Sequence, residues 1–214
     1  MASHIYTYTD PVSLKHISQA CACLQEDGLL AYPSDVNWAL AWNPASKKAL
    51  QKVQQLKPFH PQAQSFSLLC NSFAMIAKVG CVEQSHYRLL KKILPGPYTI
   101  LLKKNHDFFK SVKDKRAAVG ARYPNSCLLD ALIEAFGGPL VTSSLDFAPE
   151  SKNPPTFGYE VEELFGHGID LILDLGEEVY PQHTTIIDCT ELAPTLVRQG
   201  IGAVEGLPLC EPTL

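Results

Sequence analysis

Hydroxyl and cationic side chains at or beside predicted strand ends are the strongest chemical feature of this sequence. They are Ser34, Lys57, Thr99, Arg122, Thr142, Ser143, Ser144, Thr184, Thr185 and Arg198. Hydroxyls and fixed positive charges that meet in a strand-end crevice are suited to bind phosphate and carboxylate groups. The set holds no obvious nucleophile. An enzyme built on it would therefore work by positioning its substrates and stabilising negative charge.

Several common catalytic motifs are absent from the sequence. It has no P-loop pattern, no G-x-S-x-G elbow, no H-E-x-x-H and no G-x-G-x-x-G after a strand. The seven histidines are scattered, and Cys21 and Cys23 lie on a predicted helix, where positions two apart face different ways. We therefore expect no metal site in the protein, and any use of ATP is not of the P-loop type.

One stretch of the chain concentrates positive charge. Residues 91–122 hold nine Lys or Arg and two acidic residues, a net charge of +7 in a chain of net charge −4, which leaves −11 for the rest. Such asymmetry suggests a polyanionic partner, either nucleotide phosphates or an RNA backbone. The alternative is an ordinary solvated face of two strands and a helix, and composition alone favours that alternative.

Length and composition indicate one globular domain over residues 1–214. The chain is 46% apolar and 19% charged, and it contains no run of about 18 apolar residues that could cross a membrane. No secretory signal is visible at the N-terminus. The seven cysteines are odd in number and form no CxxC pair, which favours buried thiols in a reducing cytoplasm over a disulfide framework.

Alternating helix and strand patterns must position the polar side chains. A helix is predicted from Asp10–Pro11 to Asp27, and another from Asn43–Pro44 to Leu56. The further predicted helices span 72–79, 83–94, 126–136 and 159–166, and the strands span 29–32, 38–42, 66–70, 98–103, 117–122, 169–174, 184–188 and 195–199. Residues from Thr142 to Phe157 are expected to form a long loop. Interleaved elements of this kind predict an α/β fold with a twisted mixed β-sheet and flanking helices.

Six short motifs, in order along the chain, resemble those of the YrdC family, the threonylcarbamoyl-adenylate synthases. The motifs span residues 28–40 (family pattern G-x-x-x-x-P-T-D-T-x-Y-G-L), 95–99 (P-G-P-x-T), 120–124 (v-R-x-P), 139–146 (P-L-v-x-x-S-A-N), 184–188 (S-T-V-v-D) and 197–200 (x-R-x-G). No single motif is specific, but the ordered set is. Thr142–Leu145 and Phe66–Cys70 look most like the YciO branch of the family.

The resemblance implies a fold and a reaction. The fold is a YrdC/RibB-like twisted sheet with helices around a large, positively charged crevice. The reaction joins L-threonine, bicarbonate and ATP into threonylcarbamoyl-adenylate and pyrophosphate, for the modification of tRNA adenosine. The transition state at the α-phosphate gathers negative oxygens, which cations and hydroxyl donors stabilise. Mg²⁺ would arrive with the nucleotide and bridge its phosphates.

The resemblance also implies roles for individual residues. Lys57, Arg122 and Ser144 would form the catalytic group that holds phosphate or carboxylate oxygens. Substrate and nucleotide binding would fall to Ser34, near the threonine, and to Thr99, Thr142, Thr185 and Arg198. Each residue also has an ordinary structural alternative, such as a turn hydroxyl or a strand-end ion pair.

The sequence departs from the family pattern at the expected substrate site. The family's K-x-R-P is Lys57–His60 here, with Phe59 in place of the arginine, and its S-A-N is Ser144–Asp146. Phe cannot replace a bidentate guanidinium, and an acid beside polyphosphate costs affinity unless Mg²⁺ intervenes. Val36–Ala39 replaces the family's T-V-Y-G. We therefore expect a retained crevice with weak or redirected synthase activity.

Two other functions are consistent with these departures. One is binding of tRNA or double-stranded RNA without catalysis, motivated by the basic segment and the missing arginine. The other is a nucleotide or small-molecule sensor. Threonine-dependent release of pyrophosphate would distinguish the enzyme from both.

Overall fold

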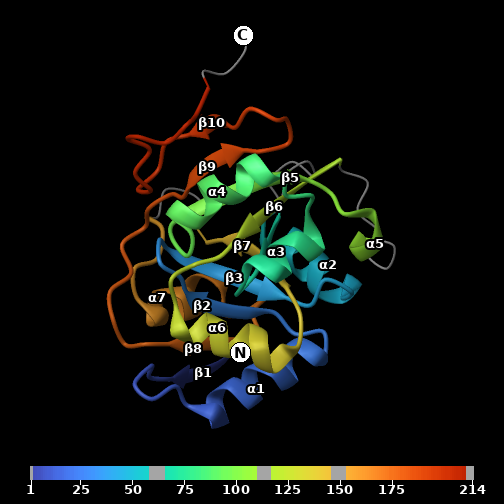
Figure 1. The fold of residues 1–214 in the computed structure, drawn as a ribbon. Helices are drawn as coiled ribbons and strands as arrows, with labels where there is room; N and C mark the ends of the chain where they lie inside the picture. The colour runs from blue at the N-terminus through green and yellow to red at the C-terminus, as the bar shows by residue number, and fades with distance from the viewer. Residues whose placement is uncertain (1, 58–65, 110–116, 146–152, 211–214) are drawn as a thin grey trace.

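The computed structural model describes residues 2–57, 66–109, 117–145 and 153–210. Strands and helices alternate along the chain, as Figure 1 shows, which confirms the predicted α/β class. The strands are β1 (Ser3–Tyr6), β2 (Leu30–Pro33), β3 (Trp38–Trp42), β4 (Ser67–Leu69), β5 (Tyr98–Lys103), β6 (Ala118–Arg122), β7 (Leu140–Ser144), β8 (Leu171–Asp174), β9 (Thr185–Asp188) and β10 (Thr195–Arg198). The helices are α1 (Leu14–Gln25), α2 (Lys47–Leu56), α3 (Phe73–Val79), α4 (Gln84–Ile93), α5 (His106–Phe109), α6 (Cys127–Phe136) and α7 (Gly158–Phe165).

All ten strands join one sheet in the order β1-β8-β2-β3-β7-β4-β6-β5-β9-β10. The pairs β1–β8, β8–β2, β4–β6 and β5–β9 are parallel, and the other neighbours are antiparallel. The sheet is therefore mixed, as expected. Because neighbours in the sheet are mostly distant in sequence, residues from all parts of the chain meet along it.

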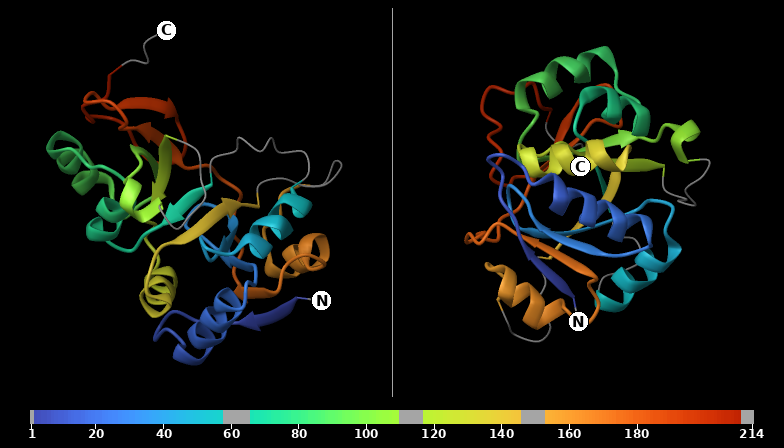
Figure 2. Two further views of the ribbon diagram at one scale, coloured as in Figure 1. Left: turned by 90° about the vertical axis from the view of Figure 1, so that its right-hand side faces the viewer. Right: turned by 90° about the horizontal axis from the view of Figure 1, so that it is seen from below.

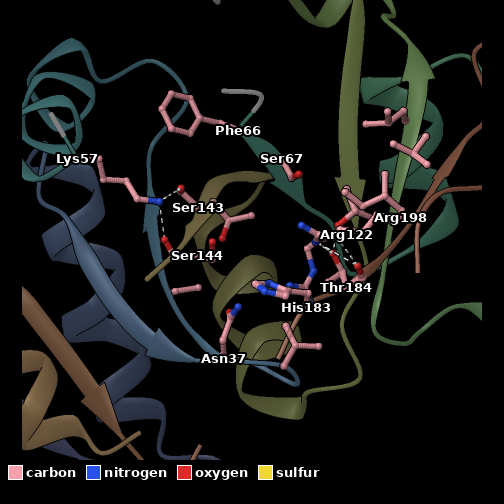
Figure 3. Close-up of a pocket in the computed structure, with 17 residues that line it drawn as sticks. Asn37, Lys57, Phe66, Ser67, Arg122, Ser143, Ser144, His183, Thr184 and Arg198 are labelled. Atoms are coloured by element: carbon pink, nitrogen blue, oxygen red, sulfur yellow. Dashed lines mark hydrogen bonds between the residues drawn. The ribbon is translucent and has the colours of Figure 1, made fainter. Parts of the chain in front are cut away.

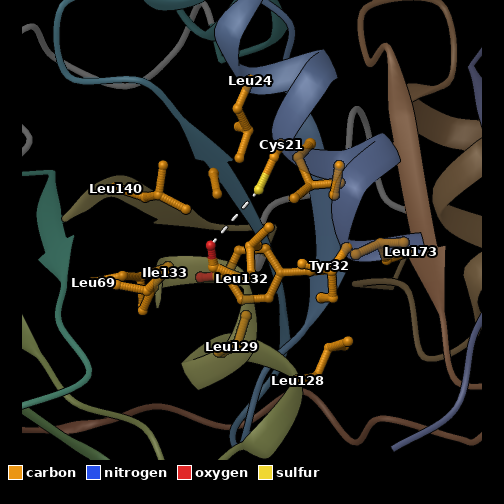
Figure 4. Close-up of a cluster of buried hydrophobic side chains, with 14 of the residues drawn as sticks. Cys21, Leu24, Tyr32, Leu69, Leu128, Leu129, Leu132, Ile133, Leu140 and Leu173 are labelled. Carbon is orange, nitrogen blue, oxygen red and sulfur yellow. Dashed lines mark hydrogen bonds between the residues drawn. The ribbon is translucent and has the colours of Figure 1, made fainter. Parts of the chain in front are cut away.

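Helices cover both faces of the β1–β7 half of the sheet. In β2, Leu30 and Tyr32 join the hydrophobic cluster of α1 and α6, which Figure 4 shows, whereas Ala31 joins the cluster of α2 and α7. This alternation is the two-residue period of a strand. Figure 2 shows the two helix pairs on opposite sides of the sheet. A strand that is buried on both faces must be apolar throughout, which explains why this segment reads as a continuous apolar run.

The other half of the sheet leaves one face for a cavity. Helices α3 and α4 cover the first face, where Ile100 and Leu102 of β5 pack into their cluster. The alternate residues of β5, Thr99 and Leu101, point to the opposite face and line a cavity. The two-residue period thus separates the core from the polar lining within a single strand.

Two helices begin later than the sequence analysis expected. Asp10–Pro11 forms a turn between the bridged residues Thr9 and Val12, and α1 is capped by Ser13, whose hydroxyl accepts from His16 N. Likewise, Ser46 rather than Asn43 caps α2 by accepting from Ala49 N at 2.9 Å. Each proline signal therefore marks the turn before a helix, and the serine hydroxyl sets its first residue.

Two strands also differ from expectation. Ser143 and Ser144 belong to β7, where they pair with Leu40 and Ala39 of β3, and not to the predicted loop. Strand β1 was not predicted; it forms because residues 3–6 pair with β8. Both differences arise from pairing between distant segments, which local patterns do not reveal. Among the described helices, none has the length and apolar character of a membrane span.

Candidate functional site: a cavity on the sheet face opposite α3 and α4

A cavity of about 370 Å³ lies against the face of β4, β5, β6 and β9 that is opposite α3 and α4, and beside the ends of β3 and β7. Figure 3 shows the side chains converging from these elements. Its lining residues are Val36, Asn37, Ala39, Lys57, Phe66, Ser67, Thr99, Leu101, Arg122, Thr142, Ser143, Ser144, His183, Thr184, Ile186, Val197 and Arg198. Six of the eight residues expected at the site are therefore brought together: Lys57, Thr99, Arg122, Thr142, Ser144 and Arg198.

Lys57 lies directly after α2 and reaches across to the end of β7. Its Nζ donates to Ser143 Oγ at 2.8 Å and to the backbone oxygen of Ser144 at 2.6 Å. The side chain is buried, so the ammonium sits in a place where water screens its charge weakly. This arrangement presents a held cation and two serine hydroxyls on one wall of the cavity.

Arg122 ends β6 and enters the cavity as one half of a buried ion pair. Its Nη2 donates to Oδ1 of Asp35, in the turn between β2 and β3, and the two side chains are 9% and 12% exposed. Arg122 Nε and Asp35 Oδ2 are buried without a hydrogen-bond partner among the described residues. The carboxylate fixes the direction of the guanidinium, whose other N–H groups can meet a phosphate or carboxylate.

Thr99, Thr184 and Arg198 form the wall opposite Lys57. Thr99 Oγ1 lies 2.9 Å from Thr184 Oγ1. The Arg198 guanidinium donates to the Thr184 backbone oxygen at 3.1 and 3.2 Å and to its Oγ1 at 3.2 Å. These bonds link β5 and β10 through Thr184, the residue just before β9, so the wall is a connected hydrogen-bond network rather than three separate side chains.

Tyr32 supports Thr142 from the core side. The Tyr32 hydroxyl lies 2.6 Å from Thr142 Oγ1. Burial raises the pKa of Tyr32 to about 12, an effect that the nearby Arg122 partly opposes. The phenol therefore stays protonated at neutral pH and can donate to Thr142, which leaves the threonine hydroxyl proton for a ligand.

Ser34 and Thr185, also expected at the site, are not among the lining residues. Ser34 Oγ donates to the Asn37 backbone oxygen at 2.6 Å and accepts from Val36 N and Asn37 N, so it closes the β2–β3 turn. Thr185 is fully buried; its Oγ1 donates to Gly202 O at 2.7 Å and accepts from Gly200 N at 3.0 Å. Both hydroxyls hold backbone beside the cavity.

The sequence analysis missed four polar residues of the site: Asp35, Asn37, Ser67 and His183. Asp35 and Asn37 lie within the motif at residues 28–40, so that motif was the available signal for them. Ser67 fits beside Gly120, where a Cβ would come within 2.6 Å of its Oγ. His183 gave no signal, because its place on the wall depends on the position of the segment before β9.

The basic segment does not gather at the cavity. Arg122 is the basic residue in the described part of that segment that lines the cavity. Lys91 and Lys92 lie exposed at the end of α4, and Lys103 pairs with Glu191 at 3.2 Å. Lys104 is buried, with Nζ 4.3 Å from the centroid of the Phe109 ring. Residues 110, 113, 115 and 116 lie outside the described ranges.

Three departures from the family pattern also fall outside the described ranges: Phe59, His60 and Asp146. The described residues hold no group of three or more His, Cys, Asp or Glu side chains arranged for a metal ion. The fixed charges in the described lining are those of Lys57, Arg122 and Arg198, with Asp35 beside Arg122. Donors to anions therefore dominate the polar part of the described cavity.

The chain is similar in sequence and in structure to several known proteins. The Escherichia coli K12 "Uncharacterized protein YciO" is 29% identical over 96% of this chain and 98% of its own. A crystal structure of E. coli YciO superposes with a TM-score of 0.86, at 28% identity over 97% of this chain and all of the other. The "Threonylcarbamoyl-AMP synthase" of Pyrococcus abyssi is 28% identical over 90% of this chain, which spans about half, 54%, of that longer protein.

A family model matches residues 22–200 and therefore most of the chain. It is the model of the Sua5, YciO and YrdC proteins, described as "Telomere recombination". The "Threonylcarbamoyl-AMP synthase" of Chromohalobacter salexigens is 30% identical over 80% of this chain and 91% of its own. The expected resemblance is confirmed, and the chain belongs to the Sua5/YciO/YrdC family.

Proposed function

We propose that this protein forms threonylcarbamoyl-adenylate and pyrophosphate from L-threonine, bicarbonate and ATP, at a slow rate. The observation that carries the proposal is the meeting of Lys57, Arg122 and Ser144 in one cavity. They come from the end of α2, from β6 and from β7, so only the fold unites them. Relatives of the same family carry the name of this synthase.

The cavity residues suit the charge that develops in this reaction. A carbamate oxygen forms a bond to the α-phosphorus of ATP, and the bond from that phosphorus to the pyrophosphate oxygen breaks. Lys57, with Ser143 and Ser144, would hold the polyphosphate. Thr99, Thr184 and Arg198 would hold the nucleotide on the other wall, and Arg122 with Thr142 the carbamate or a phosphate. Donors fixed before the reaction stabilise such charge most effectively.

Mg²⁺ would enter as part of the nucleotide substrate, since bridging phosphates is its usual binding mode. We also expect the protein to act in the cytoplasm. Its seven cysteines are all free, with Cys21, Cys70 and Cys189 buried, as in proteins of a reducing compartment.

The experiment is an assay of pyrophosphate release by the full chain with ATP, Mg²⁺, bicarbonate and L-threonine, with mass spectrometry of the adenylate product. We expect release that depends on threonine and bicarbonate, and its loss in Arg122→Gln. Lys47→Gln, at an exposed lysine of α2, serves as the matched control. A folded protein that releases no more pyrophosphate with threonine than without it, even at high enzyme concentration, would refute the proposal.

RNA binding without catalysis is the second candidate, and one surface favours it. Arg88, Lys91 and Lys92 are exposed together on α4, where Lys91 Nζ lies 5.5 Å from the centroid of the Tyr87 ring. Cations beside an aromatic ring fit a tRNA or double-stranded RNA backbone. The affinity for tRNA should then fall as salt rises and should weaken when the three cations become glutamine. An affinity that is independent of salt concentration would exclude this candidate.

A further inference from the structure

The proposed reaction requires a proton acceptor. The α-nitrogen of an amino acid is an ammonium at neutral pH, and it must lose a proton before its lone pair can attack a carbon atom. The cavity is rich in hydrogen-bond donors, because Lys57, Arg122 and Arg198 each donate a hydrogen bond to a neighbouring residue. Hydroxyl and amide side chains are too weakly basic to replace a proton acceptor at neutral pH.

His183 is the histidine among the described lining residues, and imidazole is the side chain that most often serves as a general acid–base group. In the view of Figure 3 its ring lies between Asn37 and Arg122. Asp35 is an alternative base beside the cavity, but its Oδ1 already accepts from Arg122 and it is not among the lining residues. A carboxylate that is paired with a guanidinium is a poor proton acceptor.

The backbone around His183 is anchored on both sides. The His183 backbone oxygen accepts from Ile201 N at 3.1 Å. Before it, Gln182 N donates to Val36 O at 2.8 Å, and Gln182 O accepts from Asn37 Nδ2 at 3.0 Å. After it, Thr184 is held by Thr99 and Arg198, as described above. The ring therefore projects from a segment whose position is fixed before any substrate binds, as an acid–base group requires.

We propose that His183 is the general base of the first step, an inference that rests on the proposed function. Its imidazole takes one proton from the α-ammonium of the amino acid and later returns that proton to solvent. The freed amine nitrogen forms a bond to the bicarbonate carbon, a C–O bond of bicarbonate breaks, and the departing hydroxide takes the second N–H proton to leave as water. The product is a carbamate, and atoms and charge balance.

The first test is the pH dependence of kcat/KM for threonine, measured by pyrophosphate release. A general base contributes about 10²–10⁴-fold, so His183→Gln should lower kcat/KM by about 10²-fold at pH 7 and shift the rising limb of its pH profile to higher pH. The Kd for ATP should stay within twofold. His167→Gln, at an exposed histidine outside the cavity, should leave the profile unchanged.

Two results would overturn the assignment. One is an unshifted pH profile in both His183→Gln and His183→Asn. The other is an equal loss of ATP affinity, because a base for the amine has no reason to affect nucleotide binding.

The second test does not need turnover and so separates this inference from the proposed function. The His183 ring is followed by NMR, with its resonance assigned from the His183→Gln spectrum. L-threonine should shift the resonance, and N-acetyl-L-threonine, which lacks the ammonium, should not. If L-threonine shifts the resonance but the protein releases no pyrophosphate, the proposed synthase activity is refuted, whereas the contact between His183 and the threonine ammonium is supported. An unshifted resonance would overturn the role of His183 whatever the activity.

Discussion

Asp35 and Arg122 are the most deeply buried pair of opposite charges described at the cavity. Each charge depends on the other for compensation. Removing one partner of a buried pair leaves the other charge unpaired, which costs about 3–5 kcal/mol. Asp35→Ala should therefore lower the free energy of unfolding by about that amount, whereas Asp35→Asn, which keeps a hydrogen-bond acceptor, should cost less. Urea unfolding monitored by circular dichroism measures both values.

The matched control is the Lys52–Asp170 pair, whose side chains are 37% and 40% exposed. Exposed pairs contribute up to about 1 kcal/mol, so Lys52→Met should shift stability by no more than that. Equal effects of Asp35→Ala and Lys52→Met would contradict the view that burial makes the Asp35–Arg122 pair important.

Lys57 is predicted to matter for the nucleotide rather than for folding. Lys57→Met keeps a long apolar side chain but removes the ammonium that donates to Ser143 Oγ and Ser144 O. If this cation stabilises the polyphosphate in the transition state, kcat should fall by about 10²–10³-fold, the usual effect of losing one such donor. Lys48→Met, on the same helix with a 79% exposed side chain, should retain full activity in the same assay.

At the level of single residues, the sequence predicted much of the polar lining and little of its pairing. Position at the end of a predicted element, together with the family resemblance, led to Lys57, Arg122 and Thr142, which line the cavity. It also led to Ser34 and Thr185, whose hydroxyls bind neighbouring backbone. A motif fixes which residue stands at a strand end, but whether its side chain faces the cavity depends on contacts with distant segments.

At the level of elements, patterns of apolar residues predicted most helices and strands but not α5, β1 or β7, and serine caps set the first residues of α1 and α2. Gly137, directly after the helix predicted over 126–136, has a left-handed φ of +84°, the conformation that glycine tolerates best. Strand β1 escaped prediction because its pairing with β8 brings together residues about 168 positions apart in the chain. Elements defined by local propensity were predictable, whereas those defined by partners were not.

Strand β1 also gives a prediction for pH. His4 Nδ1 lies 2.8 Å from Glu162 Oε2, and His4 Nε2 lies 2.9 Å from Asp174 Oδ2. These hydrogen bonds connect β1 to α7 and β8. Burial lowers the pKa of His4, but the hydrogen bonds and charges of Glu162 and Asp174 outweigh it, and the net pKa is raised above 6.5. The folded state therefore holds the His4 proton more tightly than the unfolded state does.

The sign of the effect follows from that difference. The stabilisation by His4 is complete below pH 6.5, the unfolded value, and is lost as pH rises through the higher folded value. The free energy of unfolding should thus decline over this window in the parent protein and decline less in His4→Gln. Denaturant unfolding at a series of pH values measures the difference. Parallel plots of the free energy of unfolding against pH for the two proteins would contradict this role of His4.

At the level of the whole molecule, the cavity lies where the two halves of the sheet meet. Its walls come from β3 and β7 on one side and from β4, β5, β6, β9 and β10 on the other. The turn that holds Asp35 and Asn37 bonds to both β6 and the segment before β9. A ligand in the cavity would add contacts between the halves and would bind only the folded chain.

A ligand that binds only the folded chain raises its melting temperature. A ligand at 100 times its Kd stabilises the folded state by about 2.7 kcal/mol, which in a chain of this size raises the Tm by about 5–10 °C. MgATP should produce such a shift in the parent protein and in Lys48→Met but a much smaller one in Lys57→Met, as measured by differential scanning calorimetry. A shift that Lys57→Met retains would mean that the nucleotide binds away from this wall. A shift without any release of pyrophosphate would identify a cavity that binds the nucleotide without turning it over, as in a sensor.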